Sequence, residues 1–135
     1  MKQCQNDGMT KEIINTDKAP AAIGAYSQAV KVRDTVYISG QIPIDPIKKV
    51  IVCDLFVDQA HQVFANLNAV SEAAGGDLSD AVKLTVYVTD LANFPILNEV
   101  MSEYLQAPFP ARATVQVAAL PLGALLEIDA VLCLS

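Results

Sequence analysis

Charged side chains are scarce in this 135-residue chain, which also has no tryptophan, one histidine and two arginines. Charged residues make up 18% of the sequence, whereas typical soluble domains contain about 25%. Hydrophobic residues make up 53%, which is more than a small domain hides in its own core. The surplus indicates apolar surface that a partner subunit covers, so we expect an oligomer.

Basic charge is especially scarce. The net charge is −6, and Lys48 and Lys49 form the only adjacent basic pair. Phosphate contacts supply most of the affinity of nucleic-acid-binding proteins, which therefore usually carry a basic stripe. Nucleic acid is thus not an expected partner.

Cysteine and histidine are too few and too scattered to build a metal site. Cys4, Cys53 and Cys133 lie far apart without Cys-x-x-Cys spacing, and His61 completes no ligand set with them. Unpaired thiols are typical of a reducing compartment. We therefore expect a cytoplasmic protein that needs no metal or other cofactor.

Signals for membrane insertion or secretion are missing as well. No apolar run reaches the ~18–20 residues that span a bilayer, and residues 1–9 are polar, without the apolar stretch of a signal peptide. We expect residues 1–9 to be a disordered extension. The remaining residues, 10–135, suit one hydrophobic core and are few for two ordinary domains.

Hydrophobic periodicity predicts the order β-β-β-α-β-α-β-β. Apolar residues recur at helical spacing between 60 and 74 and alternate strictly between 81 and 89. The expected elements are strands at 12–14, 25–30 and 35–39, a helix capped by Asp54 and running to about 74, a strand at 81–89, a helix at 94–105, and strands at 113–118 and 125–134. Two helices packed on one face of a mixed sheet give an α+β fold.

Period-two counting also separates the faces of the last two strands. The segment 125–134 has a wholly apolar set of alternate residues, which we assign to the helix side, so Glu127 and Asp129 face away from the helices. We expect Arg112, Thr114 and Gln116 to face away from the helices too, toward a partner subunit.

Arg112 is the most informative charge in the chain. It begins an otherwise apolar strand, where an unpaired charge is costly, while Arg33 lies in an expected hairpin turn. The planar guanidinium of Arg112 suits bidentate binding of a carboxylate. A structural ion pair with Glu127 or Asp129 is an equally open interpretation.

Glu127 stands in a strand otherwise made mainly of aliphatic residues. Burial would raise its pKa toward the range of a general acid or base; a salt bridge at an interface is the alternative, and Asp129 has the same two interpretations with a weaker case for catalysis. Ser39 and Gly40, at a strand end, either offer a hydroxyl and a backbone N–H to a ligand, or the glycine only marks a bend. Tyr26 either covers a pocket or packs against the domain.

Several ordered motifs together resemble one known family. The matching stretches are residues 19–29 (APAAIGAYSQA), 38–43 (ISGQIP), 86–91 (VYVTDL) followed by Phe94 and Asn98, 109–113 (FPARA) and 126–130 (LEIDA). They resemble the reactive-intermediate deaminase family (RidA, also YjgF), whose members are also labelled endoribonuclease L-PSP or translation-initiation inhibitor. The resemblance covers about residues 10 to 134.

The resemblance implies a chorismate-mutase-like fold and a homotrimer with sites in the clefts between subunits. It implies hydrolysis of 2-aminoacrylate, 2-iminopropanoate and 2-iminobutanoate to 2-keto acids and ammonia, without a cofactor. Carried over by position, Arg112 holds the substrate carboxylate and Glu127 acts with a water. The implied pocket residues are Tyr26, Ser39, Gly40, Asn98 and Thr114, the last standing where many members have cysteine and acting through its backbone.

Three other functions stay open at this point. One is a non-catalytic sensor of small acids or a chaperone-like trimer that uses the same cleft. The second is an endoribonuclease or translation inhibitor, which the acidic charge and the single histidine disfavour. The third is chorismate mutase, but its dicarboxylate substrates would need more than one site arginine.

Overall fold

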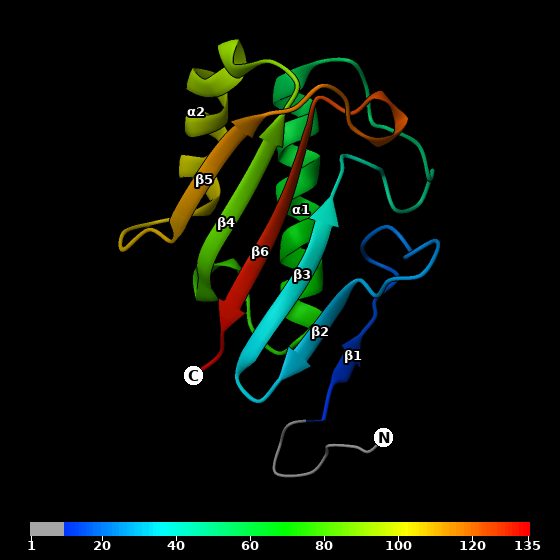
Figure 1. The fold of residues 1–135 in the computed structure, drawn as a ribbon, viewed down its shortest axis with the longest axis vertical. Helices are drawn as coiled ribbons and strands as arrows, with labels where there is room; N and C mark the ends of the chain where they lie inside the picture. Colours follow the sequence, from blue (N-terminus) through cyan, green and yellow to red (C-terminus); the bar gives the residue numbers. More distant parts are fainter. Residues whose placement is uncertain (1–9) are drawn as a thin grey trace.

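The computed structural model describes residues 10–135 as one twisted sheet backed by two helices (Figure 1). The elements are the strands β1 (Glu12–Ile14), β2 (Ala29–Val32) and β3 (Thr35–Gln41), the helix α1 (Phe56–Ala73), the strand β4 (Ala81–Val88), the helix α2 (Phe94–Tyr104), and the strands β5 (Ala111–Gln116) and β6 (Leu126–Cys133). This is the predicted order of strands and helices. The extension expected at residues 1–9, with Cys4, lies outside the described residues.

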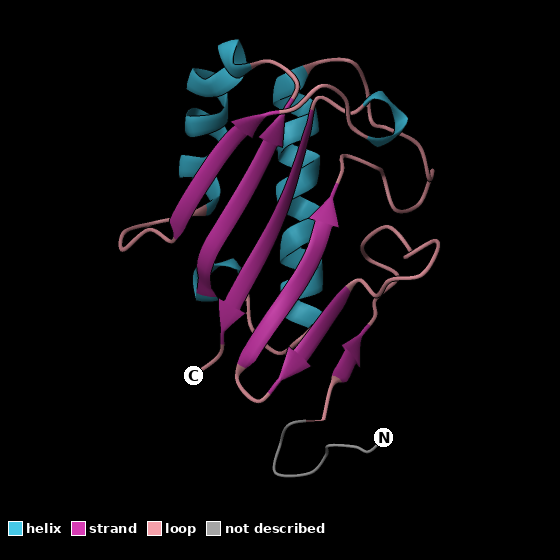
Figure 2. Cartoon of the chain, viewed as in Figure 1, coloured by secondary structure: helices cyan, strands magenta, loops and turns pink. Residues whose placement is uncertain are grey.

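The sheet has the strand order β1-β2-β3-β6-β4-β5. β5 pairs with β4 in parallel, and the other neighbouring strands pair antiparallel, so the sheet is mixed. Both helices cover the same face, and β1 and β5 form the two edges (Figure 2). The predicted α+β architecture is therefore confirmed.

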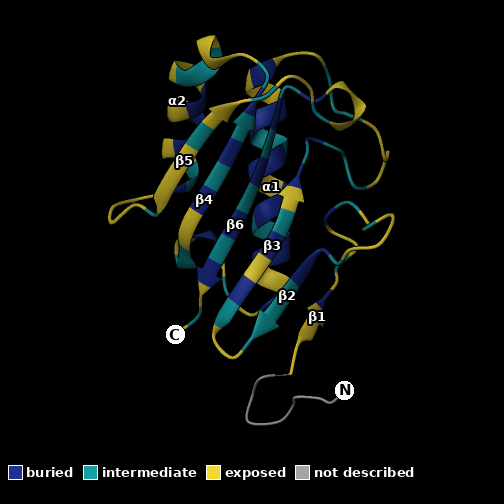
Figure 3. Cartoon of the chain, in the orientation of Figure 1, coloured by how far each residue is buried: buried dark blue, intermediate teal, exposed yellow. Residues whose placement is uncertain are grey.

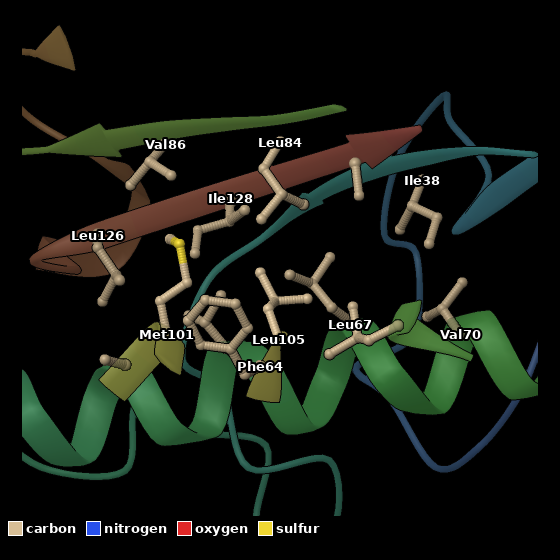
Figure 4. Packing of buried hydrophobic residues seen from close by; sticks show 14 of the residues in the cluster. Ile38, Phe64, Leu67, Val70, Leu84, Val86, Met101, Leu105, Leu126 and Ile128 are labelled. Atoms are coloured by element: carbon tan, nitrogen blue, oxygen red, sulfur yellow. The ribbon is translucent and has the colours of Figure 1, made fainter. Parts of the chain in front are cut away.

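The core lies between this face and the helices, where β3, β4 and β6 supply alternate residues (Figure 4). Leu84 and Val86 of β4 and Ile128 of β6 are fully buried there. On the helix side, Phe64 of α1 stacks on Tyr104 of α2 with ring centroids 5.0 Å apart, which joins the two helices. The alternation of buried and exposed positions along the strands is visible in Figure 3.

Two buried amides on α1 fix the loops at one end of the sheet. The side chain of Gln59 accepts the N–H of Leu125 at 2.9 Å, just before β6 begins. The amide nitrogen of Asn66 donates to the carbonyls of Ile42 and Ile44 at 3.2 and 3.1 Å. These bonds satisfy backbone groups that would otherwise be unpaired next to the core, and they hold the chain just after β3 and just before β6.

Several predicted boundaries were wrong. β2 begins at Ala29 rather than at 25, because the buried side chain of Gln28 bonds the backbone of Thr16 and Pro20 and keeps the chain before it in a loop. Asp54 does not cap α1: Leu55 is in the cap position, without a side-chain hydrogen bond. β3 continues through Gln41 instead of ending at Ser39, with a register shift between Ile38 and Gln41.

The face assigned to Arg112, Thr114 and Gln116 was also wrong. In the parallel ladder these residues lie opposite Leu84, Val86 and Val88, whose side chains are buried under the helices. All three therefore lie on the helix side of the sheet. Period-two counting shows which residues share a face, but β5 is an edge strand without a buried apolar side, so its sequence carries no signal for which face that is. β5 also begins two residues earlier than predicted, at Ala111.

Candidate functional site

Arg112 projects from β5 at the sheet edge, beside helix α2. Its Nη1 donates to the Oδ1 atom of Asn98 at 2.6 Å and lies 3.6 Å from the sulfur of Met101. Its Cζ lies 5.0 Å from the ring centroid of Phe94. The residue is exposed, so its charge stays hydrated and carries less of the desolvation cost that the sequence suggested.

A pocket of 410 Å³ opens beside this guanidinium. Its lining comes from β4, α2, the segment between α2 and β5, and the start of β5: Leu84, Asn98, Met101, Ser102, Leu105, Phe109, Pro110 and Arg112. The walls are mostly apolar, and the one charged lining group is the guanidinium. Such a combination suits a small organic anion, whose carboxylate pairs with the arginine while its carbon skeleton contacts the apolar wall.

Glu127 lies on the opposite face, near the start of β6. Burial raises the pKa of its carboxyl above the ordinary value, and the negative charge of Asp129 raises it further. The hydroxyl of Tyr87, on the neighbouring strand β4, donates to Oδ2 of Asp129 at 3.0 Å, and this bond raises the pKa of the Tyr87 phenol. A half-buried carboxyl with a raised pKa holds its proton more strongly than an exposed carboxyl, which favours a role as general acid or base.

Gly40 and Tyr26 adjoin a second, smaller hollow of 190 Å³, whose lining also includes Gln41 and Leu122. The Glu127 carboxyl lies against the α-carbon of Gly40. Tyr26 is 54% exposed, and its hydroxyl accepts the Ile23 N–H at 3.4 Å.

The hydroxyl of Ser39 donates to the carbonyl oxygen of Ser27 at 2.6 Å. This bond pins the end of β3 to the chain leading into β2. The hydroxyl proton is thus engaged within the chain, although the oxygen keeps acceptor capacity.

The predicted site residues therefore fall into two groups within one chain. Asn98, Thr114 and Arg112 lie on the helix side at the β5 edge; Tyr26, Ser39, Gly40 and Glu127 gather around the end of β3 and the start of β6. Arg112 lies opposite Leu84, which lies opposite Ala130, three residues beyond Glu127. Two strand spacings and three residues put the two α-carbons roughly 14 Å apart, and their side chains point to opposite faces. An Arg112–Glu127 or Arg112–Asp129 ion pair within one chain is thus ruled out.

Thr114 is the least explained member of the first group. Its hydroxyl oxygen is buried without a hydrogen-bond partner among the described residues. The strand that carries it has a single neighbour in the sheet, β4, so the other side of its backbone is not paired within the sheet.

Sequence reasoning missed the roles of Phe94 and Met101 beside Arg112, and of Gln28 behind the Tyr26 loop. Phe94, Asn98 and Met101 have i, i+4, i+7 spacing, which places them along one stripe of a helix. That spacing was a usable signal. The bonds of Gln28 join loop segments, and no periodic pattern indicates such contacts.

Within residues 10–135, no three or more His, Cys, Asp or Glu side chains are grouped to hold a metal ion. No helix in this part of the chain is both long and apolar enough to cross a bilayer. Cys53 and Cys133 are free thiols, and the Cys53 thiol lies 3.3 Å from Oδ2 of Asp58.

Fold and pocket together define an α+β protein with an arginine at the rim of a mostly apolar pocket. The family model described as Endoribonuclease L-PSP matches residues 16–133. A protein of Dermatophagoides farinae named 2-iminobutanoate/2-iminopropanoate deaminase is 47% identical over 121 residues, covering 90% of this chain and 94% of that protein. The chain therefore belongs to the Endoribonuclease L-PSP family, and the resemblance inferred from the sequence is confirmed.

Solved structures agree in fold and sequence. RidA from a Psychrobacter species superposes with a TM-score of 0.88 at 55% identity, covering 91% of this chain and 99% of that chain. The E. coli protein TdcF, solved with bound serine, superposes with a TM-score of 0.86 at 43% identity, covering 92% of this chain and 99% of that chain.

Proposed function

We propose that this protein hydrolyses 2-imino acids and their enamine tautomers, such as 2-aminoacrylate, 2-iminopropanoate and 2-iminobutanoate, to 2-keto acids and ammonia. The observation that carries the proposal is the Arg112 guanidinium, held at the rim of an apolar pocket of 410 Å³. The name of the Dermatophagoides relative supports the same reaction. The serine bound to TdcF supports a ligand of amino-acid size with a carboxylate.

The chemistry needs orientation and one proton acceptor. Arg112 holds the carboxylate of the protonated imine, and the Glu127 carboxylate takes a proton from water as the water oxygen bonds to the imine carbon and the C=N electron pair moves to nitrogen. The protonated Glu127 then returns this proton to the nitrogen of the carbinolamine. The C–N bond breaks, ammonia leaves, and the oxygen passes its remaining proton to the Glu127 carboxylate as the keto group forms. The substrate's own C=N group supplies the electron sink, so the proposed route uses no cofactor.

Arg112 and Glu127 lie on opposite faces in one chain, so the proposed site needs Glu127 from a second copy. Tyr26, Ser39 and Gly40 would accompany that Glu127, while Asn98 and Thr114 accompany Arg112. A contact between two different surfaces, repeated around a rotation axis, closes into a ring. We propose a homotrimer of chorismate-mutase-like subunits with three such sites.

Exposed apolar side chains on the face away from the helices support this assembly. Tyr37 of β3 is 54% exposed and Val115 of β5 is 42% exposed. Both flank the half-buried central strands of that face. A partner subunit covering them would also complete the burial of Glu127.

A coupled assay tests the reaction. An amino-acid oxidase generates the imine, and its decay and the ammonia released are timed with and without the protein. Arg112→Lys should lose most of the acceleration, because an ammonium lacks the planar fork. Arg33→Lys, the same change at the other arginine, is the control and should keep it. Wild-type activity of Arg112→Lys would place the carboxylate site elsewhere.

Two other functions give different results in the same experiments. A non-catalytic sensor of small acids would bind pyruvate without accelerating imine decay. An endoribonuclease, which the family description names, would cleave RNA in an Arg112-dependent way in preparations free of other nucleases; the net charge of −6 weakens RNA binding at physiological salt. We propose a cytoplasmic location, since unpaired cysteines are typical of reducing compartments.

A further inference from the structure

Three residues along one stripe of α2 surround the Arg112 guanidinium. Phe94 presents its ring 5.0 Å from Cζ, Asn98 accepts a hydrogen bond from Nη1 at 2.6 Å, and the Met101 sulfur lies 3.6 Å from the same nitrogen. We propose that Phe94 and Asn98 are positioning residues, which orient Arg112 so that its Nε–Nη2 edge receives the substrate carboxylate. This inference rests on the proposed function and specifies how its anion site is built.

The N–H groups that Asn98 and Met101 leave unengaged indicate which edge of the Arg112 guanidinium binds the carboxylate. A guanidinium has five N–H groups, one on Nε and two on each terminal nitrogen. Contacts with Asn98 and Met101 engage Nη1, and within residues 10–135 no hydrogen bond engages Nε or Nη2. These two nitrogens form a parallel pair of donors that matches the two oxygens of a carboxylate.

Arg112 needs such support because of its place in the fold. It projects from an edge strand and is exposed, so its long side chain would otherwise sample many rotamers. Binding a ligand would then cost the entropy of ordering it. The Phe94 ring restrains the plane of the guanidinium from one side by a cation–π contact, and the Asn98 oxygen restrains rotation within that plane.

Asn98 thus acts through Arg112. The sequence resemblance placed it in the pocket as a substrate-binding residue, and it does line the pocket. Its side-chain oxygen, however, is engaged by Nη1. That oxygen influences the carboxylate by fixing the arginine that binds it.

Two pairs of variants test the inference. Phe94→Leu keeps an apolar side chain against the core but removes the ring, and Phe94→Tyr keeps the ring. Asn98→Ala removes the acceptor at an exposed position, so it tests the inference even if Phe94→Leu folds poorly. Ile96→Ala, an exposed apolar position on the same helix without a polar contact to Arg112, is the control.

The readouts are the Kd of pyruvate by calorimetry and the split of KM and kcat in imine hydrolysis. We expect Phe94→Leu and Asn98→Ala to raise Kd and KM about 3- to 10-fold, with a much smaller change in kcat, as loss of one such contact implies. Phe94→Tyr and Ile96→Ala should stay near the wild type. In an Arg112→Ala background, Phe94→Leu should cause no further loss of kcat/KM, because its effect passes through the guanidinium.

Failure of the positioning role and failure of the proposed function would give different results. Wild-type Kd and KM in both Phe94→Leu and Asn98→Ala, with Arg112→Ala impaired, would overturn the positioning role alone. Equal losses in Phe94→Leu and Phe94→Tyr, or additive losses with Arg112→Ala, would also overturn it, since the role would then be packing. Wild-type pyruvate affinity and activity in Arg112→Ala itself would overturn the proposed function.

Discussion

The carboxyl group of Glu127 on β6 lies directly against the α-carbon of Gly40 on β3. A methyl group added at position 40 would overlap Oε2 of Glu127 and come within 2.8 Å of its carboxyl carbon. The absence of a side chain at position 40 therefore leaves the space that the Glu127 carboxyl occupies. It also explains Gly40 without a special backbone angle, because the position is not in the left-handed region that favours glycine.

Gly40→Ala should consequently displace the Glu127 carboxyl. We expect a loss of kcat of about tenfold or more, as for a misplaced general base, with a smaller change in pyruvate affinity because the Arg112 guanidinium still binds the carboxylate. Thermal unfolding should also shift to lower temperature from overpacking. In a Glu127→Ala background the added methyl group should no longer lower the unfolding temperature; a loss of the same size there would show that the contact with Glu127 is unimportant.

Subunit complementation tests the proposed shared site. Arg112→Ala and Glu127→Gln should each be nearly inactive alone. If each site takes Arg112 and Glu127 from different chains, random mixing of the two variants by refolding together should restore about a quarter of the wild-type sites. Each variant refolded alone is the control. A mixture no more active than its components, with mixed oligomers shown by mass spectrometry, would contradict a site shared in this way.

The sequence predicted the order of elements because its patterns come from burial. The strict alternation at 81–89 and the helical spacing at 60–74 reflect side chains such as Leu84 and Phe64, which are fully buried. β5 could not be oriented in the same way. It is exposed on nearly all of its residues, so its pattern could not show that Arg112 faces α2.

The candidate site could be predicted from the sequence only in part, for a related reason. Ordered motifs identified Arg112, Glu127 and Gly40 as a set, but motifs carry no information on which side chains share a face in one chain. Register decides that, and register depends on pairing between β3, β6, β4 and β5, which are distant in sequence. The Gln28 network could not be predicted for a different reason: its partners are loop carbonyls 8–12 residues away, and no periodic pattern marks them.

Glu127→Gln should lower the activity and raise the unfolding temperature at neutral pH. Burial raises its pKa in the folded chain, so the protonated form is favoured by folding. Its contribution to stability is full below the unfolded-state pKa, about 4.3, and is lost as the pH rises through the folded-state pKa. Glu127→Gln should therefore unfold at a higher temperature than the wild type at pH 7.5, and the difference should vanish near pH 4.

The same variant should lose about 10²–10⁴-fold in kcat, the usual contribution of a general base. Glu99→Gln, at an exposed position of α2, is the control for stability and should show no such pH-dependent gain. A wild-type kcat in Glu127→Gln would mean that water attacks the bound imine without Glu127 as the base.

The charge of Asp129 should move the acid limb of the pH–rate profile to higher pH, because it raises the pKa of Glu127. The two carboxyls lie on the same face of β6, and the charge of Asp129 adds to burial in raising the pKa of Glu127. The base must be ionised to accept a proton from water, so activity should fall as the pH drops through that pKa. Asp129→Asn removes the charge while keeping an oxygen that can still accept the Tyr87 hydroxyl.

Asp129→Asn should therefore move the acid limb to lower pH, because the Glu127 carboxyl then ionises more readily. The limb should not reach the position of a fully exposed carboxyl, since burial, the larger cause, remains. The rate at the pH optimum should change by only a few fold, because a lower pKa also makes Glu127 a weaker base. The measurement is kcat between pH 4.5 and 8.

Tyr87→Phe is the matched control. It removes the hydroxyl that donates to Asp129 at 3.0 Å but leaves the charge, so the acid limb of this variant should not move to lower pH. If the acid limb of Asp129→Asn stayed in place while Glu127→Gln abolished the limb, the charge of Asp129 would not affect the pKa of Glu127 in the assembled enzyme. If both variants kept the limb, another group would be the base.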